Sequence, residues 1–256
     1  MTTLEIHQFP CRSDNYGVLA HSAETNETAS IDAPDANAVL AALEDKSWSL
    51  THVFTTHHHN DHTEGNLALK QQTGATIFGP KAEADKIPGI DQAFGDGDAF
   101  EFAGHRVHVL DTPGHTAGHI SYWLPDDNVA FVGDTLFAMG CGRLFEGTPA
   151  QMWASLQKII ALPTDTTIYC GHEYTQANAA FSLTVDPNNP TLRARAKEVE
   201  ALRAAGKPTL PTKLDIELET NPFLRPDDPG IRATLNMPDA ANEDVFAELR
   251  ERKNNS

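Results

Sequence analysis

The sequence has few cysteines, which excludes several classes of protein. Its 256 residues include only three, Cys11, Cys141 and Cys170, and none belongs to a Cys-x-x-Cys pair. So small a number cannot supply a disulfide framework. We therefore expect buried free thiols in a reducing compartment. A cysteine nucleophile is not expected, because the sequence places no base for Cys141 or Cys170.

Basic side chains and long apolar runs are also scarce. Lys and Arg number 19 against 36 Asp and Glu, so the formal net charge is −17 at pH 7. This charge argues against nucleic acid and anionic membranes as partners, although a few clustered cations could still hold an anionic substrate. Residues 1–7 lack a basic segment followed by an apolar run, and no stretch is long enough to span a membrane. We expect a cytoplasmic monomer.

Strands and helices alternate over the first two-thirds of the chain. Short apolar runs predict strands, and apolar residues at helical spacing predict helices. The predicted strands are 4–9, 16–20, 29–32, 52–55, 75–78, 106–110, 120–124, 129–132 and 167–170, with helices at 38–43, 65–72 and 149–162. Later helices at 176–183, 192–205 and 243–252 are joined by proline-rich connections, and no strand is predicted among them. We expect an α/β catalytic domain over residues 1–173 and a smaller helical domain over 174–256.

A dense run of metal-ligand residues follows the predicted strand 52–55. His57, His59, Asp61 and His62 fall within six residues of the sequence. Side chains at alternate positions of extended backbone point the same way, so His57 and His59 can bind one ion together. Asp61 and His62 lie just beyond, where the chain turns, and can face a second ion. Imidazole and carboxylate groups suit Zn²⁺, Fe²⁺ or Mn²⁺.

Three further candidate ligands each follow the end of a predicted strand and come directly after a glycine. They are His115, Asp134 and His172. Glycine lets the backbone turn tightly, so the three strand ends point to one rim. The set fills two sites: His57, His59 and His115 for one metal, Asp61, His62 and His172 for the other, with Asp134 able to bridge both. An oxygen position between the ions is left for water, as in a catalytic site.

Other histidines have different interpretations. His58 is expected to point away from the metals. His119 is close enough to His115 in sequence to support the site by hydrogen bonding without being a ligand. The remaining candidates are interpreted as surface or core residues: His7, His21, His52, His105 and His108.

Motifs spread along nearly the whole chain carry a family resemblance. The metal-ligand motifs are Thr56-His57-His58-His59-Asn60-Asp61-His62, Thr112-Pro113-Gly114-His115-Thr116, Gly133-Asp134-Thr135 and Gly171-His172. They resemble the metallo-β-lactamase superfamily. Ser13-Asp14-Asn15-Tyr16, residues 140–147, residues 171–175 and Asn221-Pro222-Phe223-Leu224-Arg225 narrow the resemblance to its hydroxyacylglutathione hydrolase, or type II glyoxalase, family. The resemblance implies an αββα sandwich with the metals at one edge and a helical C-terminal domain that completes the substrate pocket.

The resemblance also implies where glutathione is bound. The family's contacts fall on Arg143, Tyr174, Arg250 and Lys253. Arg143 stands where several members have Lys, which keeps the cation. Phe145 stands where several have Tyr, which removes a hydroxyl. From the residues alone, Arg250 and Lys253 lie in a charged terminal helix of the kind that usually forms a solvated face.

The expected reaction is hydrolysis of S-D-lactoylglutathione to D-lactate and glutathione, in methylglyoxal detoxification. Two divalent metals, most simply zinc, with iron or manganese as alternatives, make hydroxide available near neutral pH. Asp61 and Asp134 are the catalytic candidates, and Asp61 could both ligate a metal and orient the hydroxide. The rival is a mononuclear-iron glutathione persulfide dioxygenase of the same superfamily, against which the complete second-site set and the long helical C-terminal region argue. A non-catalytic member that binds proteins would be expected to have lost ligands.

Overall fold

The computed structural model describes residues 3–256, and their backbone contacts divide into two compact units. The first unit contains the residues up to Asp111 together with Thr116–Gly133. The second contains Thr112–His115 and Asp134–Ser256. The metal-ligand candidates are therefore shared between the units, His57 to His62 in the first and His115, Asp134 and His172 in the second.

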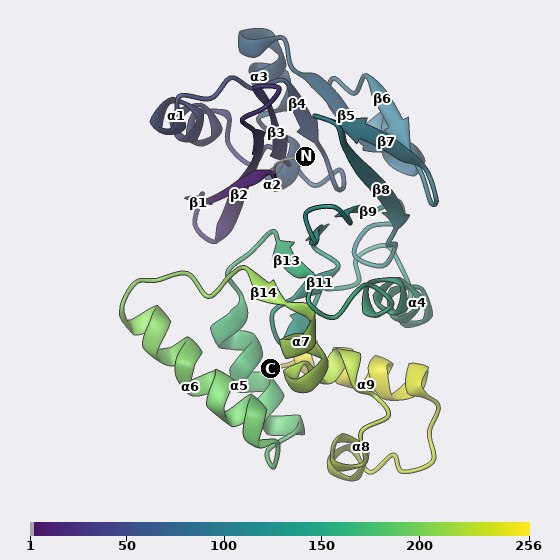
Figure 1. The fold of residues 1–256 in the computed structure, drawn as a ribbon. Coiled ribbons are helices and arrows are strands. Elements are labelled where there is room, and N and C mark those ends of the chain that lie inside the picture. Colours follow the sequence, from purple (N-terminus) through teal and green to yellow (C-terminus); the bar gives the residue numbers. More distant parts are fainter. Residues whose placement is uncertain (1–2) are drawn as a thin grey trace. The chain divides into compact units, whose positions relative to one another are not determined.

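One sheet of the first unit has its strands in sequence order. These are β1 (Glu5–Cys11), β2 (Asn15–Ser22), β3 (Glu27–Ile31), β4 (His52–Phe54), β5 (Thr76–Pro80) and β6 (Gln92–Phe94). The first three pair antiparallel and the rest parallel. Parallel neighbours need crossover connections. Here the connections contain α1 (Ala36–Lys46), then α2 (Asn60–Thr63) with α3 (Asn66–Thr73), and finally the 3-10 segment η1 (Lys81–Lys86) (Figure 1).

The first unit also contains four antiparallel strands that follow β6. They are β7 (Ala99–Phe102), β8 (His105–Asp111), β9 (Ile120–Leu124) and β10 (Val129–Gly133). An aromatic core joins them to the first sheet. The ring of Phe54 on β4 lies 5.1 Å from that of Phe100 and 5.5 Å from that of Tyr122. The preceding residue, Val53, points to the other face of the sheet and packs in the cluster that includes Val39 of α1 and Leu69 of α3.

Local capping residues set the ends of two helices in the first unit. Asp35 caps α1 by accepting a hydrogen bond from the amide of Ala38 at 3.0 Å. Helix α3 ends at Gly74, whose φ of 76° is the left-handed conformation that glycine adopts without strain. Strands β6 and β7 were not predicted; most of their residues are exposed or half-buried.

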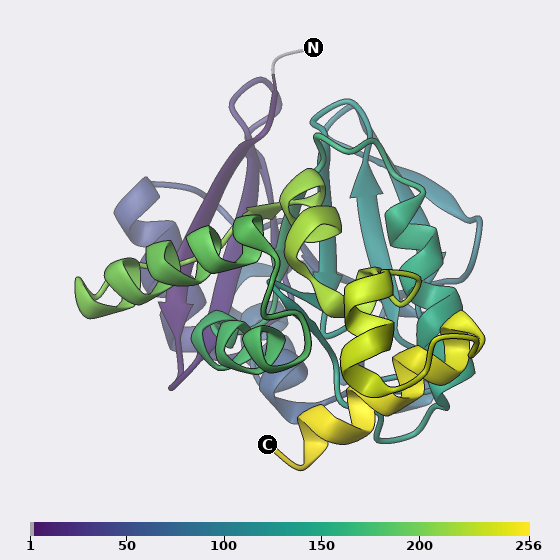
Figure 2. The same cartoon turned by 90° about the horizontal axis from the view of Figure 1, so that it is seen from below.

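The second unit is built largely from helices. They are α4 (Pro149–Ile160), α5 (Thr175–Val185), α6 (Pro190–Ala204), α7 (Leu214–Thr220), the 3-10 turn η2 (Pro222–Leu224), α8 (Pro229–Leu235) and α9 (Asn242–Asn254). Helix α4 begins at Pro149, the first residue of the predicted helix 149–162, and Thr148 and Gln151 form a capping box at its start. Helix α5 runs beside α6, and α9 packs on α4; Figure 2 shows the yellow α9 next to the teal α4. Phe223 anchors the interior, with ring contacts to Phe181 and Phe246.

Short strands in the second unit correct one prediction. The hairpin of β11 (Leu136–Phe137) and β12 (Gly140–Cys141) was not predicted, and β13 (Thr167–Cys170) pairs antiparallel with β14 (Thr212–Lys213). The expectation that no strand follows residue 174 is therefore wrong. Two residues are too few to show the alternation by which a strand is predicted. Within residues 3–256, no helix is both long and apolar enough to cross a membrane.

All three cysteines are free and buried, as predicted. Burial raises the pKa of the thiols of Cys11, Cys141 and Cys170. A raised pKa keeps each sulfur in its unreactive protonated form.

Candidate active site

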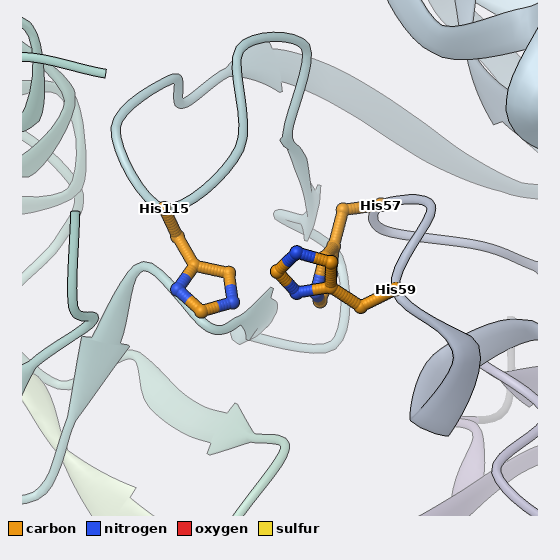
Figure 3. Close-up of side chains that lie close together, drawn as sticks. All are labelled: His57, His59 and His115. Atoms are coloured by element: carbon orange, nitrogen blue, oxygen red, sulfur yellow. The ribbon is translucent and has the colours of Figure 1, made fainter. Parts of the chain in front are cut away.

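The histidine run occupies the loop and short helix after β4. Figure 3 shows His57 and His59 leaving the same loop. Nε2 of His57 lies 3.2 Å from Nδ1 of His59, and the rings of His57 and His62 have centroids 4.1 Å apart. His57 and His62 are buried. The first unit therefore gathers the predicted imidazoles into one group.

Asp32 orients His62, and the sequence analysis did not identify it. Oδ2 of Asp32 lies 2.8 Å from Nδ1 of His62. A carboxylate only accepts hydrogen bonds, so Nδ1 carries the proton and Nε2 presents its lone pair, 3.6 Å from Oδ2 of Asp61. Asp32 also accepts hydrogen bonds from the amide and hydroxyl of Thr56. In the sequence, the signal for Asp32 is its position at the end of the predicted strand 29–32. The structure adds that its φ is 57°.

Asn15 and Glu83 hold the backbone around the ligands. The side-chain amide of Asn15 donates to both the carbonyl and Oδ2 of Asp61, each at 3.2 Å. The buried carboxylate of Glu83 accepts from the amides of His58 at 3.0 Å and Gly118 at 2.7 Å. The His58 ring also turns to Glu83, with Nδ1 2.9 Å from Oε2. These contacts fix the chain at His58 and at Asp61, on either side of His59.

His119 lies beside the histidine run, and its ring stacks 4.8 Å from that of His57. Three further histidines of the first unit contact residues outside this group. His52 packs among phenylalanine rings, His21 stacks on Trp48, and His105 pairs with Asp127.

The second unit gathers the other candidate ligands. His115 lies on the loop after β8 (Figure 3), Asp134 directly follows β10 in the chain, and His172 follows β13. Nε2 of His115 and Nε2 of His172 each lie 3.3 Å from Oδ2 of Asp134. Nδ1 of His115 donates to the carbonyl of Arg143 at 2.8 Å. All three side chains are buried.

These donor atoms fit a divalent cation. A carbonyl only accepts, so the proton of the neutral His115 ring sits on Nδ1, and Nε2 directs a lone pair at the Asp134 carboxylate. Two such electron-rich atoms repel each other, and a cation bound between them would remove this repulsion. Two ligands about 2.1 Å from one zinc ion, at a tetrahedral angle, stand about 3.4 Å apart. The observed separation of 3.3 Å matches that value. The same reasoning applies to His62 and Asp61 in the first unit.

A cavity of about 410 Å³ opens beside His115 and Asp134 within the second unit. Its wall combines aromatic rings, three cations and the β12 cysteine: Phe137, Phe145, Tyr174, Arg143, Arg250, Lys253 and Cys141. The Tyr174 ring stacks on that of His172, with centroids 4.8 Å apart and an interplanar angle of 2°. The residues predicted from the resemblance to bind glutathione therefore line one cavity, with the candidate ligands His115 and Asp134 in the same wall.

The cations in the cavity wall differ in exposure. Arg250 is only 6% exposed, lies over the Phe223 ring and donates to the carbonyl of Cys141 at 2.8 Å. The solvated face that charge pattern alone predicts for Arg250 is therefore wrong. Lys253 is half-buried, and burial lowers the pKa of its ammonium, with the nearby charges of Arg250 and Arg143 acting in the same direction. Three positive groups therefore line one cavity of a protein whose net charge is −17, and together they attract anions to it.

Comparison with known proteins decides the family. Residues 22–172 match the family model of the metallo-beta-lactamase superfamily, and residues 173–256 match the one described as hydroxyacylglutathione hydrolase C-terminus. The chain belongs to the hydroxyacylglutathione hydrolase family. Proteins of that name from Brucella anthropi and Brucella ovis are each 61% identical over 250 residues, which is 98% of this chain and 96% and 97% of theirs.

Solved structures show the same fold. The ETHE1 structure from Myxococcus xanthus has a TM-score of 0.70 and 26% identity, covering 98% of this chain and 91% of that one. The BLEG-1 B3 metallo-beta-lactamase has a TM-score of 0.67 and 20% identity, covering 86% and 99%. The predicted metallo-β-lactamase fold with an added C-terminal region is thereby confirmed.

Proposed function

We propose that this member of the family hydrolyses the thioester of a hydroxyacylglutathione. The observation that carries the proposal is the cation-lined cavity whose wall includes His115 and Asp134. Glutathione has two carboxylates that such cations can hold by charge-assisted hydrogen bonds. The 61% identity to hydroxyacylglutathione hydrolases supports the same substrate class.

The candidate ligands would bind the metal ions. We assign one ion to His57, His59 and His115 and the other to Asp61, His62 and His172, with Asp134 shared. Two divalent ions, when bound, lower the pKa of water and polarise a carbonyl group. Zinc is the simplest occupant, with iron or manganese as alternatives.

The chain's own side chains would orient the reaction. Asp61, held by Asn15, would align the attacking water. Arg143, Tyr174, Arg250 and Lys253 would hold the glutathione part so that the thioester carbonyl lies beside His115 and Asp134. Departure of a thiolate needs little help from an acid, because a thiolate is far less basic than an amide or alkoxide leaving group.

The proposal extends to finer points. We propose S-D-lactoylglutathione as the substrate, with D-lactate and glutathione as products, and a place in methylglyoxal detoxification. We also propose that the protein is cytoplasmic and monomeric. The division into a catalytic domain of residues 1–173 and a helical domain of residues 174–256 stays a prediction.

A thioesterase assay on a panel of acylglutathiones, with metal content measured on the same sample, tests the proposal. We expect hydrolysis of S-D-lactoylglutathione with close to two metal ions per chain. Oxygen consumption with glutathione persulfide and one iron per chain would instead identify the dioxygenase alternative. Absence of both activities in fully metal-loaded protein would contradict an enzymatic role.

A further inference from the structure

A tight turn next to the cavity is held by buried side chains from distant parts of the second unit. It joins β11 to β12 through Ala138 and Met139. Met139 has a φ of 53°, which is costly for a residue with a side chain. The turn therefore needs partners that hold its backbone in place.

Each partner binds a different polar group of the turn. The side-chain amide of Asn178 donates to the carbonyl of Ala138 at 3.1 Å, and the hydroxyl of Ser182 donates to the carbonyl of Met139, also at 3.1 Å. The Met139 amide donates to Oε2 of Glu217 at 2.7 Å. The turn is thus bound on both its carbonyl and its amide groups.

Glu217 on α7 is the centre of this network. Its carboxylate is fully buried, and Oε2 also accepts from the side-chain amide of Asn221 at 3.0 Å. That same amide of Asn221 donates to the carbonyls of Phe137 and Gly140, at 3.1 and 3.0 Å. Oε1 faces away from the turn and accepts from the hydroxyl of Thr212 at 2.7 Å. A carboxylate, with acceptor sites on both oxygens, suits this set of donors.

The turn sets the position of one wall of the cavity. Phe137 precedes it, and its ring lies 5.3 Å from that of Tyr174 and 6.0 Å from that of His172. Cys141, on β12, offers the carbonyl that accepts from Arg250. A shift of the hairpin would therefore displace both the aromatic wall and the buried cation of the cavity.

We propose that Glu217 and Asn221 are positioning residues for substrate. Their hydrogen bonds hold residues 137–140 in place, so that Phe137 and Arg250 keep the cavity in the shape that fits glutathione. This inference rests on the proposed function, because it takes the cavity to be the glutathione site. Neither residue touches substrate. Their effect passes through the hairpin.

Variants that remove different hydrogen bonds of the Glu217 carboxylate distinguish a role in positioning substrate from a role in stability alone. Glu217→Ala removes the hydrogen bond to the turn. Thr212→Val is the matched control, since it removes one hydrogen bond to the same carboxylate on the side away from the turn. Glu217→Gln is the conservative rescue: its amide oxygen can keep Met139 and Asn221, while its NH₂ group can donate to the Thr212 hydroxyl. Ser182→Ala, which frees the Met139 carbonyl, replaces Glu217→Ala if that variant does not fold.

The measurements are KM and kcat for S-D-lactoylglutathione, calorimetric binding of S-methylglutathione, metal content and melting temperature. We expect Glu217→Ala or Ser182→Ala to raise KM and weaken S-methylglutathione binding by about 10-fold, with kcat changed less than about 3-fold and metal content unchanged. Thr212→Val should lower the melting temperature alone, and Glu217→Gln should stay near the wild type.

Two results would overturn the inference, and they can be told apart. If Glu217→Ala and Thr212→Val both lower the melting temperature and neither changes KM, the network is only structural. If Lys253→Met also leaves KM and S-methylglutathione binding unchanged, the cavity is not the glutathione site and the proposed function fails with it.

Discussion

His115 presents Nε2 to the carboxylate of Asp134, 3.3 Å away, while its Nδ1 proton is donated to the carbonyl of Arg143. This hydrogen bond fixes which ring nitrogen of His115 carries the lone pair that a metal would bind. It also links this candidate ligand to the backbone of Arg143, whose side chain lines the cavity. The orientation of the His115 ring and the shape of the cavity therefore depend on the same short segment of chain.

Removal of the Asp134 carboxylate should abolish metal binding and activity together. In Asp134→Ala the ring nitrogens of His115 and His172 lose the anion that they share, so we expect metal content to fall and hydrolysis to drop at least about 1,000-fold. Metal analysis and the thioester assay on one sample check this. Asp239→Ala, at an exposed aspartate, is the control. Full activity of Asp134→Ala would refute the site, as would full activity of Asp61→Ala or of exhaustively chelated protein.

Asp32→Asn should weaken metal binding without removing a ligand. An asparagine tolerates the positive φ at this position, yet its amide cannot reproduce the carboxylate that fixes the Nδ1 proton of His62. We expect metal affinity to fall by about 10- to 100-fold, as for other groups that orient a ligand. Activity should return as metal is added to the assay. Asp35→Asn, which keeps a competent helix cap, should titrate like the wild type; identical metal affinities for the two variants would exclude the role of Asp32.

Lys253 is the best position at which to test whether the cations of the cavity bind substrate. Arg250 is buried against Phe223, so its truncation would also disturb packing. Lys253→Met keeps the aliphatic stem and removes the charge, and we expect KM for S-D-lactoylglutathione to rise about 10- to 100-fold through loss of a charge-assisted hydrogen bond. The control is Arg252→Met on the same helix, whose charge pairs with Glu248 at the surface. Equal KM values in both variants would remove Lys253 from the site.

The candidate metal ligands could be recognised in the sequence because they are concentrated in short motifs. His57 to His62 are adjacent in sequence, and each remaining ligand follows a strand that its apolar residues reveal. The fold and the family follow from the same motifs. Local spacing is thus sufficient where the function needs several ligands on one loop.

The supporting residues could not be predicted, because their partners are distant in sequence. Asp32 meets His62 across 30 residues, and Glu217 meets Met139 across 78. A lone Asp or Glu has no pattern of its own. Arg250 is a case in which the local pattern was misleading. Its charged neighbours predicted a solvent-exposed side chain, whereas contacts with the Phe223 ring and the Cys141 carbonyl hold it in the interior.

Acid should destabilise the protein partly through His52. Its ring packs 5.3 Å from Phe78 and 5.4 Å from Phe102, and burial lowers its pKa, with Glu27 opposing the effect. The folded state therefore holds His52 neutral, while the unfolded chain protonates it near its ordinary pKa of 6.5. The unfolded state binds more protons as the pH falls through that value, so the stability present above it is progressively lost.

His52→Phe should reduce this loss, since phenylalanine fits the aromatic surroundings and does not titrate. Urea unfolding at pH 7.5 and at pH 5.5 should show a smaller difference in free energy for the variant than for the wild type. His21 and His7, whose pKa values burial also lowers, keep part of the pH dependence. Thr51→Val is the control, because it removes the hydroxyl next to His52 Nδ1 and leaves the imidazole in place. It should lower stability at both pH values alike; a wild-type pH dependence in His52→Phe would show that His52 is protonated equally in the folded and unfolded chains.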